Sequence, residues 1–189
     1  MEREKTIKIA TLLFAQYGIK AVSMEQIALE LSISKKTLYD DFMDREHLLQ
    51  ECMDRETARL SLSMEYIRVS SKSALESILL SCTNLYNYCS SFCPAFHRDI
   101  TRFTTIHNRW KSYLQRFQKR CMADFIRGTT ENDFLPGQNY ELISFMLTDQ
   151  LEYPKKKYQP TMVVTLIRGV CTEKGSAKLD KLLERENEK

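Results

Sequence analysis

The chain has 189 residues, of which 43% are hydrophobic and 28% charged, with a net charge of +3. A chain of this length can bury on the order of two-thirds of its unfolded surface, which favours one large or two small domains. The composition excludes a membrane-spanning protein, because no apolar run approaches the roughly 20 residues of a span. The N-terminal MEREKTIK also lacks the apolar stretch of a signal peptide, so we expect a cytoplasmic location.

Cysteine content and charge distribution narrow the class further. The six cysteines stand at positions 52, 82, 89, 93, 121 and 171, and five Gly with four Pro leave little room for a loop-rich disulfide scaffold. We expect mostly buried thiols. Residues 1–50 hold seven Lys and Arg against eight Asp and Glu, a net of −1. Any binding to nucleic acid must therefore depend on locally placed cations and helix N-termini.

Three short helices are predicted at the N-terminus. The segment from Thr6 to Tyr17 has an apolar face at helical spacing. The segment from Ser23 to Phe42, SMEQIALELSISKKTLYDDF, predicts two more helices joined by a tight turn, one ending near Leu31 and the other running from Lys35 to Phe42. Helices this short need a third across them to bury their apolar faces, so we predict a small helix-turn-helix head.

The rest of the chain predicts further helices and no strand. A long helix capped by Asp44 is expected to run to residue 66 or 69, and a short helix is expected to begin at Pro94. The other expected helices are Ser73 to Cys89, Thr105 to Arg127, Asn139 to Glu152, Pro160 to Cys171 and Ala177 to Arg185. Gly128 is expected to end the helix before it, and GTTENDFLPGQ to form a loop. YPKKKYQP separates the helices that precede and follow it.

Two of these helices, Asn139 to Glu152 and Pro160 to Cys171, are apolar on more than one face. A helix that is apolar nearly all round is buried on both sides, and in a small protein the second side needs a partner. We therefore expect a dimer in which two helices from each protomer form a four-helix bundle. The expected interface residues are Leu142, Phe145, Met146, Met162, Val163, Leu166, Ile167 and Val170.

A run of spaced residues near the N-terminus carries a family resemblance. It comprises Phe14, Gly18, Val22-Ser23, Ile27-Ala28, Ile33-Ser34, Thr37-Leu38-Tyr39, Phe42, Arg45 and Leu48, and it resembles the DNA-binding domain of the TetR family of bacterial transcriptional regulators. The resemblance implies an all-α homodimer of about nine or ten helices, with a helix-turn-helix head at 1–48 and an effector-binding and dimerisation body at 49–189. Our hypothesis is that effector binding changes the spacing of the two heads.

The candidate DNA contacts lie in the predicted helix-turn-helix and at the start of the long helix after it. They are Ser23, Ser34, Lys35, Lys36, Thr37, Tyr39, Asp41 and Arg45. Lysine side chains can reach base edges or phosphates from a recognition helix, and hydroxyl groups can bond phosphates. A solvated lysine pair on an ordinary helix is the plain alternative. Asp41 stands where the family often has His, and Ser32 where it often has Gly, so Asp40-Asp41 bring negative charge to the expected phosphate side.

An aromatic cluster in the body is the candidate effector pocket. Its residues are Tyr86, Cys89, Phe92, Phe96, Phe103, His107, Trp110, Tyr113, Phe117 and Met146. Pockets of this composition bind small apolar molecules, although the same residues could simply form core. We expect a double-stranded operator DNA, a small apolar or aromatic effector and a second copy of the chain as partners, with the regulator acting as a repressor released by its effector.

Other chemistries are poorly supported. Cys89 and Cys93 could form a redox pair, or half a metal site with His97, but no fourth ligand is visible. No nucleophile triad, phosphate-binding glycine loop or His-Glu helix motif is present, so we expect no enzyme activity, no cofactor and no metal. Two functional alternatives stay open: an all-helical carrier or interaction module that does not bind DNA, and a cysteine-based redox sensor.

Overall fold

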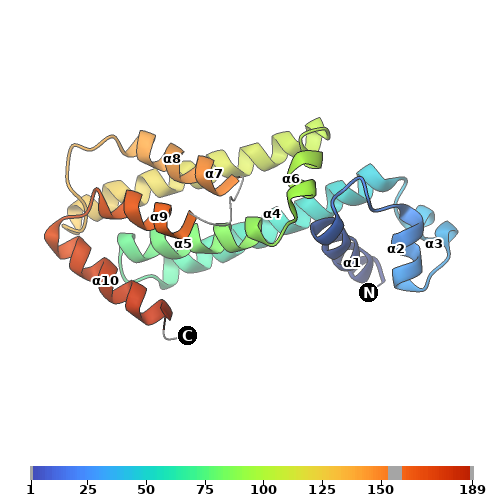
Figure 1. Ribbon diagram of the computed structural model, residues 1–189, viewed down its shortest axis with the longest axis horizontal. Helices are drawn as coiled ribbons and strands as arrows, with labels where there is room; N and C mark the ends of the chain where they lie inside the picture. The colour runs from blue at the N-terminus through green and yellow to red at the C-terminus, as the bar shows by residue number, and fades with distance from the viewer. Residues whose placement is uncertain (1, 153–158, 188–189) are drawn as a thin grey trace. The chain divides into compact units, whose positions relative to one another are not determined.

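Ten α-helices make up the described part of the chain, residues 2–152 and 159–187 of the computed structural model (Figure 1). They are α1 (Glu2–Tyr17), α2 (Met24–Leu31), α3 (Lys35–Asp41), α4 (Arg45–Ser70), α5 (Ala74–Ser90), α6 (Pro94–Ile100), α7 (Thr104–Thr130), α8 (Tyr140–Glu152), α9 (Gln159–Arg168) and α10 (Glu173–Asn187). The predicted all-α fold is confirmed. Most of the predicted linker YPKKKYQP lies outside the described residues.

Two compact units divide the chain. The first comprises residues 1–61 and 90–113, and the second comprises 62–89 and 114–189. Helices α4 and α7 therefore each contribute to both units. The predicted boundary at residue 48 concerns function, between a DNA-contacting head and a body. It stays a prediction.

The N-terminal helices of the first unit share one apolar core. Phe14 of α1 and Ile27 of α2 are buried, and Leu38 and Phe42 have no exposed surface. A seven-residue helix such as α3 is unstable alone, so these contacts hold it. Helix α1 begins at Glu2, earlier than predicted. Its first turn forms two ion pairs with α4, Arg3 with Glu51 and Glu4 with Arg55. An apolar pattern in the sequence does not show such pairs.

Helix α6 lies against the end of α1. The Cys93 N–H donates to the Ala15 carbonyl oxygen at 2.7 Å, and the Lys20 N–H donates to Asp99 Oδ2 at 2.9 Å. Gly18 has φ +89, and a Cβ there would lie 2.7 Å from the Cβ of Ala95. Glycine is therefore needed both to end α1 and to admit α6.

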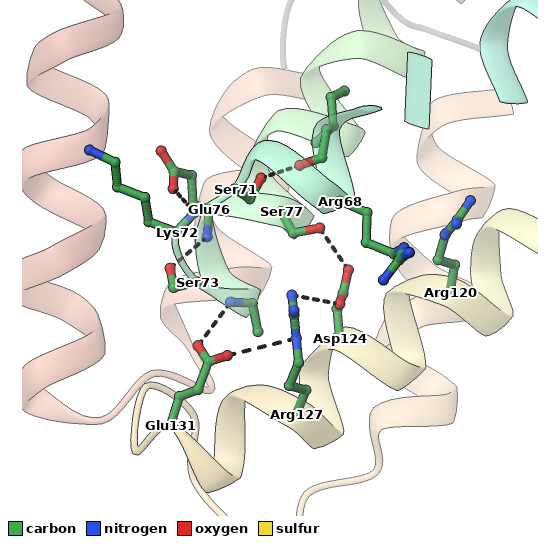
Figure 2. A network of polar contacts seen from close by, with 12 residues as sticks. Arg68, Ser71, Lys72, Ser73, Glu76, Ser77, Arg120, Asp124, Arg127 and Glu131 are labelled. Atoms are coloured by element: carbon green, nitrogen blue, oxygen red, sulfur yellow. Dashed lines mark hydrogen bonds and ion pairs between the residues drawn. The ribbon is translucent and has the colours of Figure 1, made fainter. Parts of the chain in front are cut away.

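A polar network joins α5 to α7 in the second unit (Figure 2). Ser77 Oγ donates to Asp124 Oδ2 at 2.8 Å, and Arg127 Nη2 lies 2.9 Å from Asp124 Oδ1. Glu131 Oε2 accepts a hydrogen bond from the Ala74 N–H at 2.9 Å, which satisfies a free donor at the start of α5. The network gives the largely buried Asp124 carboxylate both a hydroxyl donor and a cation.

Helix α7 continues through Gly128 to Thr130, so the prediction that Gly128 ends it was wrong. A Cβ at Gly128 would lie 2.3 Å from the ring of Phe134, which shows that the glycine serves close packing. Asn132, with φ 57, adopts the left-handed conformation after the helix. The Asp133 N–H then donates to the Gly128 carbonyl oxygen at 2.9 Å, as in a helix C-cap.

Helix α10 begins at Glu173, four residues before the predicted Ala177. Thr172 caps it, because its Oγ1 accepts the Gly175 N–H at 3.0 Å. Gly175 lies directly against the backbone of Asp133, and Lys178 forms an ion pair of 2.5 Å with the buried Asp133 carboxylate. The predicted start at Ala177 thus missed Gly175, the residue at which α10 packs against Asp133.

Helix α8 contacts α9, and α9 contacts α10. None of the helices in the described ranges is long and apolar enough to cross a membrane.

Candidate nucleic-acid interface

A tight turn separates α2 from α3. Ser23 caps α2, because its Oγ accepts the Gln26 N–H at 3.2 Å while its own N–H donates to Gln26 Oε1 at 2.8 Å. After α2, Ser32 is left-handed with φ 56 and ψ 37, and the Ile33 N–H donates to the Ala28 carbonyl oxygen at 3.0 Å. These bonds fix the exit from α2 at the tight turn that the sequence predicted.

Helix α3 has one buried face and one exposed face. Ser34 caps it by accepting the Thr37 N–H at 3.0 Å, and the two hydroxyl oxygens of Ser34 and Thr37 lie 2.8 Å apart. Leu38 points into the core, with no exposed surface. The residues on the other face are exposed, and they are Ser34, Lys35, Lys36, Thr37, Tyr39, Asp40 and Asp41.

Lys35 does not extend freely from α3. Its Nζ forms a hydrogen-bonded ion pair with Glu25 Oε1 at the start of α2 and lies 5.7 Å from the centre of the Tyr39 ring. The hydrogen bond to Glu25 raises the pKa of Lys35, and the hydrogen bond to Lys35 lowers the pKa of Glu25. Glu25 was not among the predicted site residues, because a pair ten residues apart on two helices leaves no periodic signal.

Arg45 is anchored to the backbone of the head. Its Nη1 donates to the carbonyl oxygens of Ile19 and Val22, each at 3.3 Å, and the side chain is part-buried. The predicted phosphate contact can therefore use only the donors that remain on this guanidinium. The structure gives Arg45 a positioning task that the sequence did not indicate, which is to hold the connection between α1 and α2.

Arg3, also absent from the predicted set, supports the C-terminal end of α3. Its Nη1 donates to the Asp41 carbonyl oxygen at 2.7 Å, and its guanidinium lies 4.4 Å from the centre of the Phe42 ring. The Asp41 side chain itself stays exposed. Arg3 therefore stabilises the end of α3 through the backbone and does not neutralise the Asp41 carboxylate.

The segment that contains α2 and α3 has a negative net charge. Residues 24–42, all of which the structure describes, hold two basic and four acidic side chains, a net of −2. Because Lys35 is paired, Lys36 is the one basic residue of that segment that takes part in no ion pair within the described chain. Attraction to phosphate must therefore depend on few groups.

Residues 7–52, which span α1 to the first part of α4, match a family model described as "Bacterial regulatory proteins, tetR family". The head of the chain is therefore a TetR-type domain. The resemblance seen in the spaced residues of the head is therefore confirmed. No curated protein sequence matches the chain significantly.

Solved structures of transcriptional regulators share the fold over nearly the whole length. A TetR-family regulator from Marinobacter aquaeolei VT8 has 18% identity and a TM-score of 0.76, with 97% of each chain covered. A gamma-butyrolactone receptor described as ArpA-like has 19% identity and a TM-score of 0.72, covering 97% of this chain and 96% of its own. The ketosteroid regulator KstR2 of Mycobacterium tuberculosis has 18% identity and a TM-score of 0.67, covering 92% and 96%.

The ten predicted effector residues fall in both compact units, so each group is described within its own unit. In the first unit the rings of Phe92 and Phe96 are 4.3 Å apart, and Trp110 stacks on Tyr113 at 5.3 Å and 16°. The other two members there, Phe103 and His107, are half-buried. In the second unit Cys89 and Phe117 are buried, Tyr86 is half-buried and Met146 is exposed.

A hollow of about 350 Å³ opens between α1 and α2, and none of the ten predicted effector residues lines it. Its walls include Leu13, Tyr17 and Leu29. The predicted pocket stays a prediction.

The exposed apolar residues of α8 match part of the predicted dimer interface. Leu142, Phe145 and Met146 are 51%, 53% and 38% exposed. Exposure of Met146 favours the interface over the pocket, the other role predicted for it. In and after α9, Met162 and Leu166 are half-buried, whereas Val163, Ile167 and Val170 are already buried in the single chain, which narrows the surface available to a partner.

All six cysteines are free thiols. Cys89 is buried and Cys93 half-buried. Within the described ranges, no group of three His, Cys, Asp or Glu residues could hold a metal ion.

Proposed function

We propose that this TetR-family protein is a homodimeric, ligand-responsive DNA-binding regulator that represses transcription until a small apolar or aromatic molecule releases it from its operator. The observation that carries the proposal is the family match at residues 7–52, together with the outward position of the α3 side chains. In a helix-turn-helix protein the second helix enters the major groove and its first residues meet base edges.

Three side chains of α3 carry the contact. Lys36 is exposed and forms no ion pair with the residues that the structure describes, so it reaches a phosphate or the acceptor edge of guanine. Thr37 keeps its methyl group free for a thymine methyl while its hydroxyl stays near Ser34. Tyr39, 41% exposed, offers its hydroxyl to a phosphate. Ser23 keeps its hydroxyl proton for a further phosphate, because its oxygen acts as an acceptor in the cap. Of the two hydroxyl groups of Ser34 and Thr37, one donates to the other, which leaves one proton for phosphate.

Dimerisation places two such helices on one duplex. The exposed Leu142, Phe145 and Met146 of α8, with Met162 and Leu166 of α9, form the apolar surface that a second copy covers. A two-fold dimer reads a near-palindromic site whose half-sites lie about one helical turn apart.

Effector binding is the regulatory part of the proposal. Two similar structures are named a ketosteroid regulator and a gamma-butyrolactone receptor, which supports a small, largely apolar effector. An effector releases DNA only if it binds the DNA-free conformation more tightly. Trp110 is the single tryptophan of the chain and is buried, so quenching of its fluorescence by a panel of steroids and lactones reports binding. Unchanged fluorescence and unchanged thermal stability with every compound would count against this effector class.

Mutation of α3 tests the DNA assignment. We expect Lys36→Ala and Tyr39→Phe to weaken binding to duplex DNA while sedimentation still shows a dimer. Lys119→Ala, an exposed lysine of α7, is the matched control and should leave binding unchanged. Wild-type affinity in both head variants would remove α3 from the interface.

The acidic balance of residues 24–42 favours one alternative, an all-helical carrier or interaction module that does not use its head. Such a protein would show no binding to random duplex at low salt, whereas phosphate contacts produce a steep dependence of affinity on salt concentration.

A further inference from the structure

We propose that Glu25 competes with DNA phosphates for Lys35 and so suppresses binding to non-specific DNA. The inference rests on the proposed DNA-binding function and adds to it a residue outside α3 that lowers the affinity for random DNA. Glu25 makes no direct base contact in this role, since it acts through the position of Lys35.

The geometry of the pair supports this role. Lys35 is the first residue of α3, and its Nζ turns back to Glu25 Oε1 near the start of α2 while lying 5.7 Å from the centre of the Tyr39 ring. Both partners are exposed, with 53% and 57% of their side-chain surfaces accessible. A phosphate on this face of the head therefore meets a neutralised lysine beside a carboxylate.

The pair lowers affinity modestly, because exposed ion pairs are weak. While Glu25 holds Lys35, this lysine neutralises no DNA phosphate, and a duplex gains the contact only at the cost of the pair. Glu25 therefore weakens binding to random DNA.

The neighbouring charges strengthen the argument. Lys35 and Lys36 are the two basic residues between 24 and 42, so pairing one of them leaves half of the local positive charge for phosphate. Glu30 lies on the same helix as Glu25, is exposed and takes part in no ion pair within the described chain. Glu30 thus provides a control for the plain effect of removing one negative charge.

The experiment compares Glu25→Gln with Glu30→Gln in the full-length chain. Binding to a labelled random-sequence duplex is followed by fluorescence anisotropy over a series of salt concentrations. For Glu25→Gln we expect roughly two- to fivefold tighter binding, the range of an exposed pair. The plot of log affinity against log salt should be steeper by about 0.9, the value for one additional phosphate contact. Glu30→Gln should leave the slope unchanged.

A double variant tests that the gain passes through Lys35. In Lys35→Met, adding Glu25→Gln should bring no tighter binding and no steeper slope. Equal behaviour of Glu25→Gln and Glu30→Gln, or weaker binding by Glu25→Gln, overturns the inference while the wild-type chain still binds DNA. Absence of any wild-type binding at low salt overturns the proposed function and this inference together.

Discussion

Replacement of Gly175 by alanine should destabilise the second unit, although alanine is the better helix former. Gly175 lies in α10, and a Cβ there would stand 1.9 Å from the carbonyl oxygen of Asp133 and 2.9 Å from its carbonyl carbon. The obstacle is backbone, so no side-chain rotation removes it. The oxygen would have to move by about 1.1 Å to reach even 3.0 Å. That oxygen also accepts the Thr172 N–H at 3.0 Å, which the movement would strain.

The two opposing effects can be compared. Alanine in a helix interior is worth about 1 kcal/mol over glycine. Overpacking a filled site costs about 1–3 kcal/mol, and more where backbone must shift and a buried ion pair such as Lys178–Asp133 is disturbed. We expect a net loss of about 2 kcal/mol in the free energy of unfolding. For a chain of this size the melting temperature falls by about 2–4 °C per kcal/mol, so the shift should be about 4–8 °C.

The assay is thermal unfolding followed by circular dichroism, with Gly169→Ala as the matched control. At Gly169 the nearest atom to an added Cβ is the Thr165 carbonyl oxygen at 3.4 Å, which is ordinary contact, so alanine should be neutral or stabilising. A Gly175→Ala melting temperature equal to or above that of Gly169→Ala would refute the packing of α10 against residue 133.

Three further outcomes follow from particular side chains. Phe145→Arg should weaken dimerisation at least tenfold in sedimentation, whereas Ile126→Arg, at an equally exposed position of α7, should not; identical sedimentation of the two would move the interface elsewhere. Ser32→Gly should raise the free energy of unfolding of the head by about 0.5–1 kcal/mol, because Ser32 is left-handed with φ 56; a loss in urea unfolding would contradict this. Burial raises the pKa of the Cys52 thiol to about 12 from about 9, so the folded state loses stability as pH rises from 9 towards 12. Wild type should lose about 1 kcal/mol more than Cys52→Ala between pH 8 and pH 10, and an equal loss would show that the thiol is not responsible.

The head could be predicted from the sequence because its signals are local. Ser23 and Ser34 cap helices a few residues away, and Leu38 and Phe42 show their inward positions by helical spacing. Patterns of this kind need no knowledge of the tertiary structure. The family match at residues 7–52 covers the same short-range features.

The errors lie where distant segments touch. Gly128 looked like a helix end, yet it lies within α7, where the ring of Phe134 leaves no room for a Cβ. The last helix was predicted to begin at Ala177, yet α10 also includes Gly175, which packs against the backbone of Asp133. Arg45 looked free for phosphate, but its guanidinium donates to carbonyl oxygens 23 and 26 residues earlier in the chain. Such contacts depend on the tertiary arrangement and leave no periodic trace in the sequence.

The candidate site shows the same limit. Exposure of Lys36 and Tyr39 followed from the helical pattern, whereas the pairing of Lys35 with Glu25 depends on the angle between two helices. The predicted dimer surface meets the same limit. Residues such as Val163 and Ile167 are covered by their own chain, and an apolar pattern cannot distinguish that cover from a partner.

Selection of bound duplexes from a random DNA pool tests the central claim most directly. A dimer that places two α3 helices in the major groove predicts enrichment of one inverted repeat, with half-site centres about 10 base pairs, or a multiple of that distance, apart. Lys36→Met, carried through the same selection, should lose the enrichment. Recovery of no preferred sequence, or of a single unpaired half-site by the wild-type chain, would contradict the account.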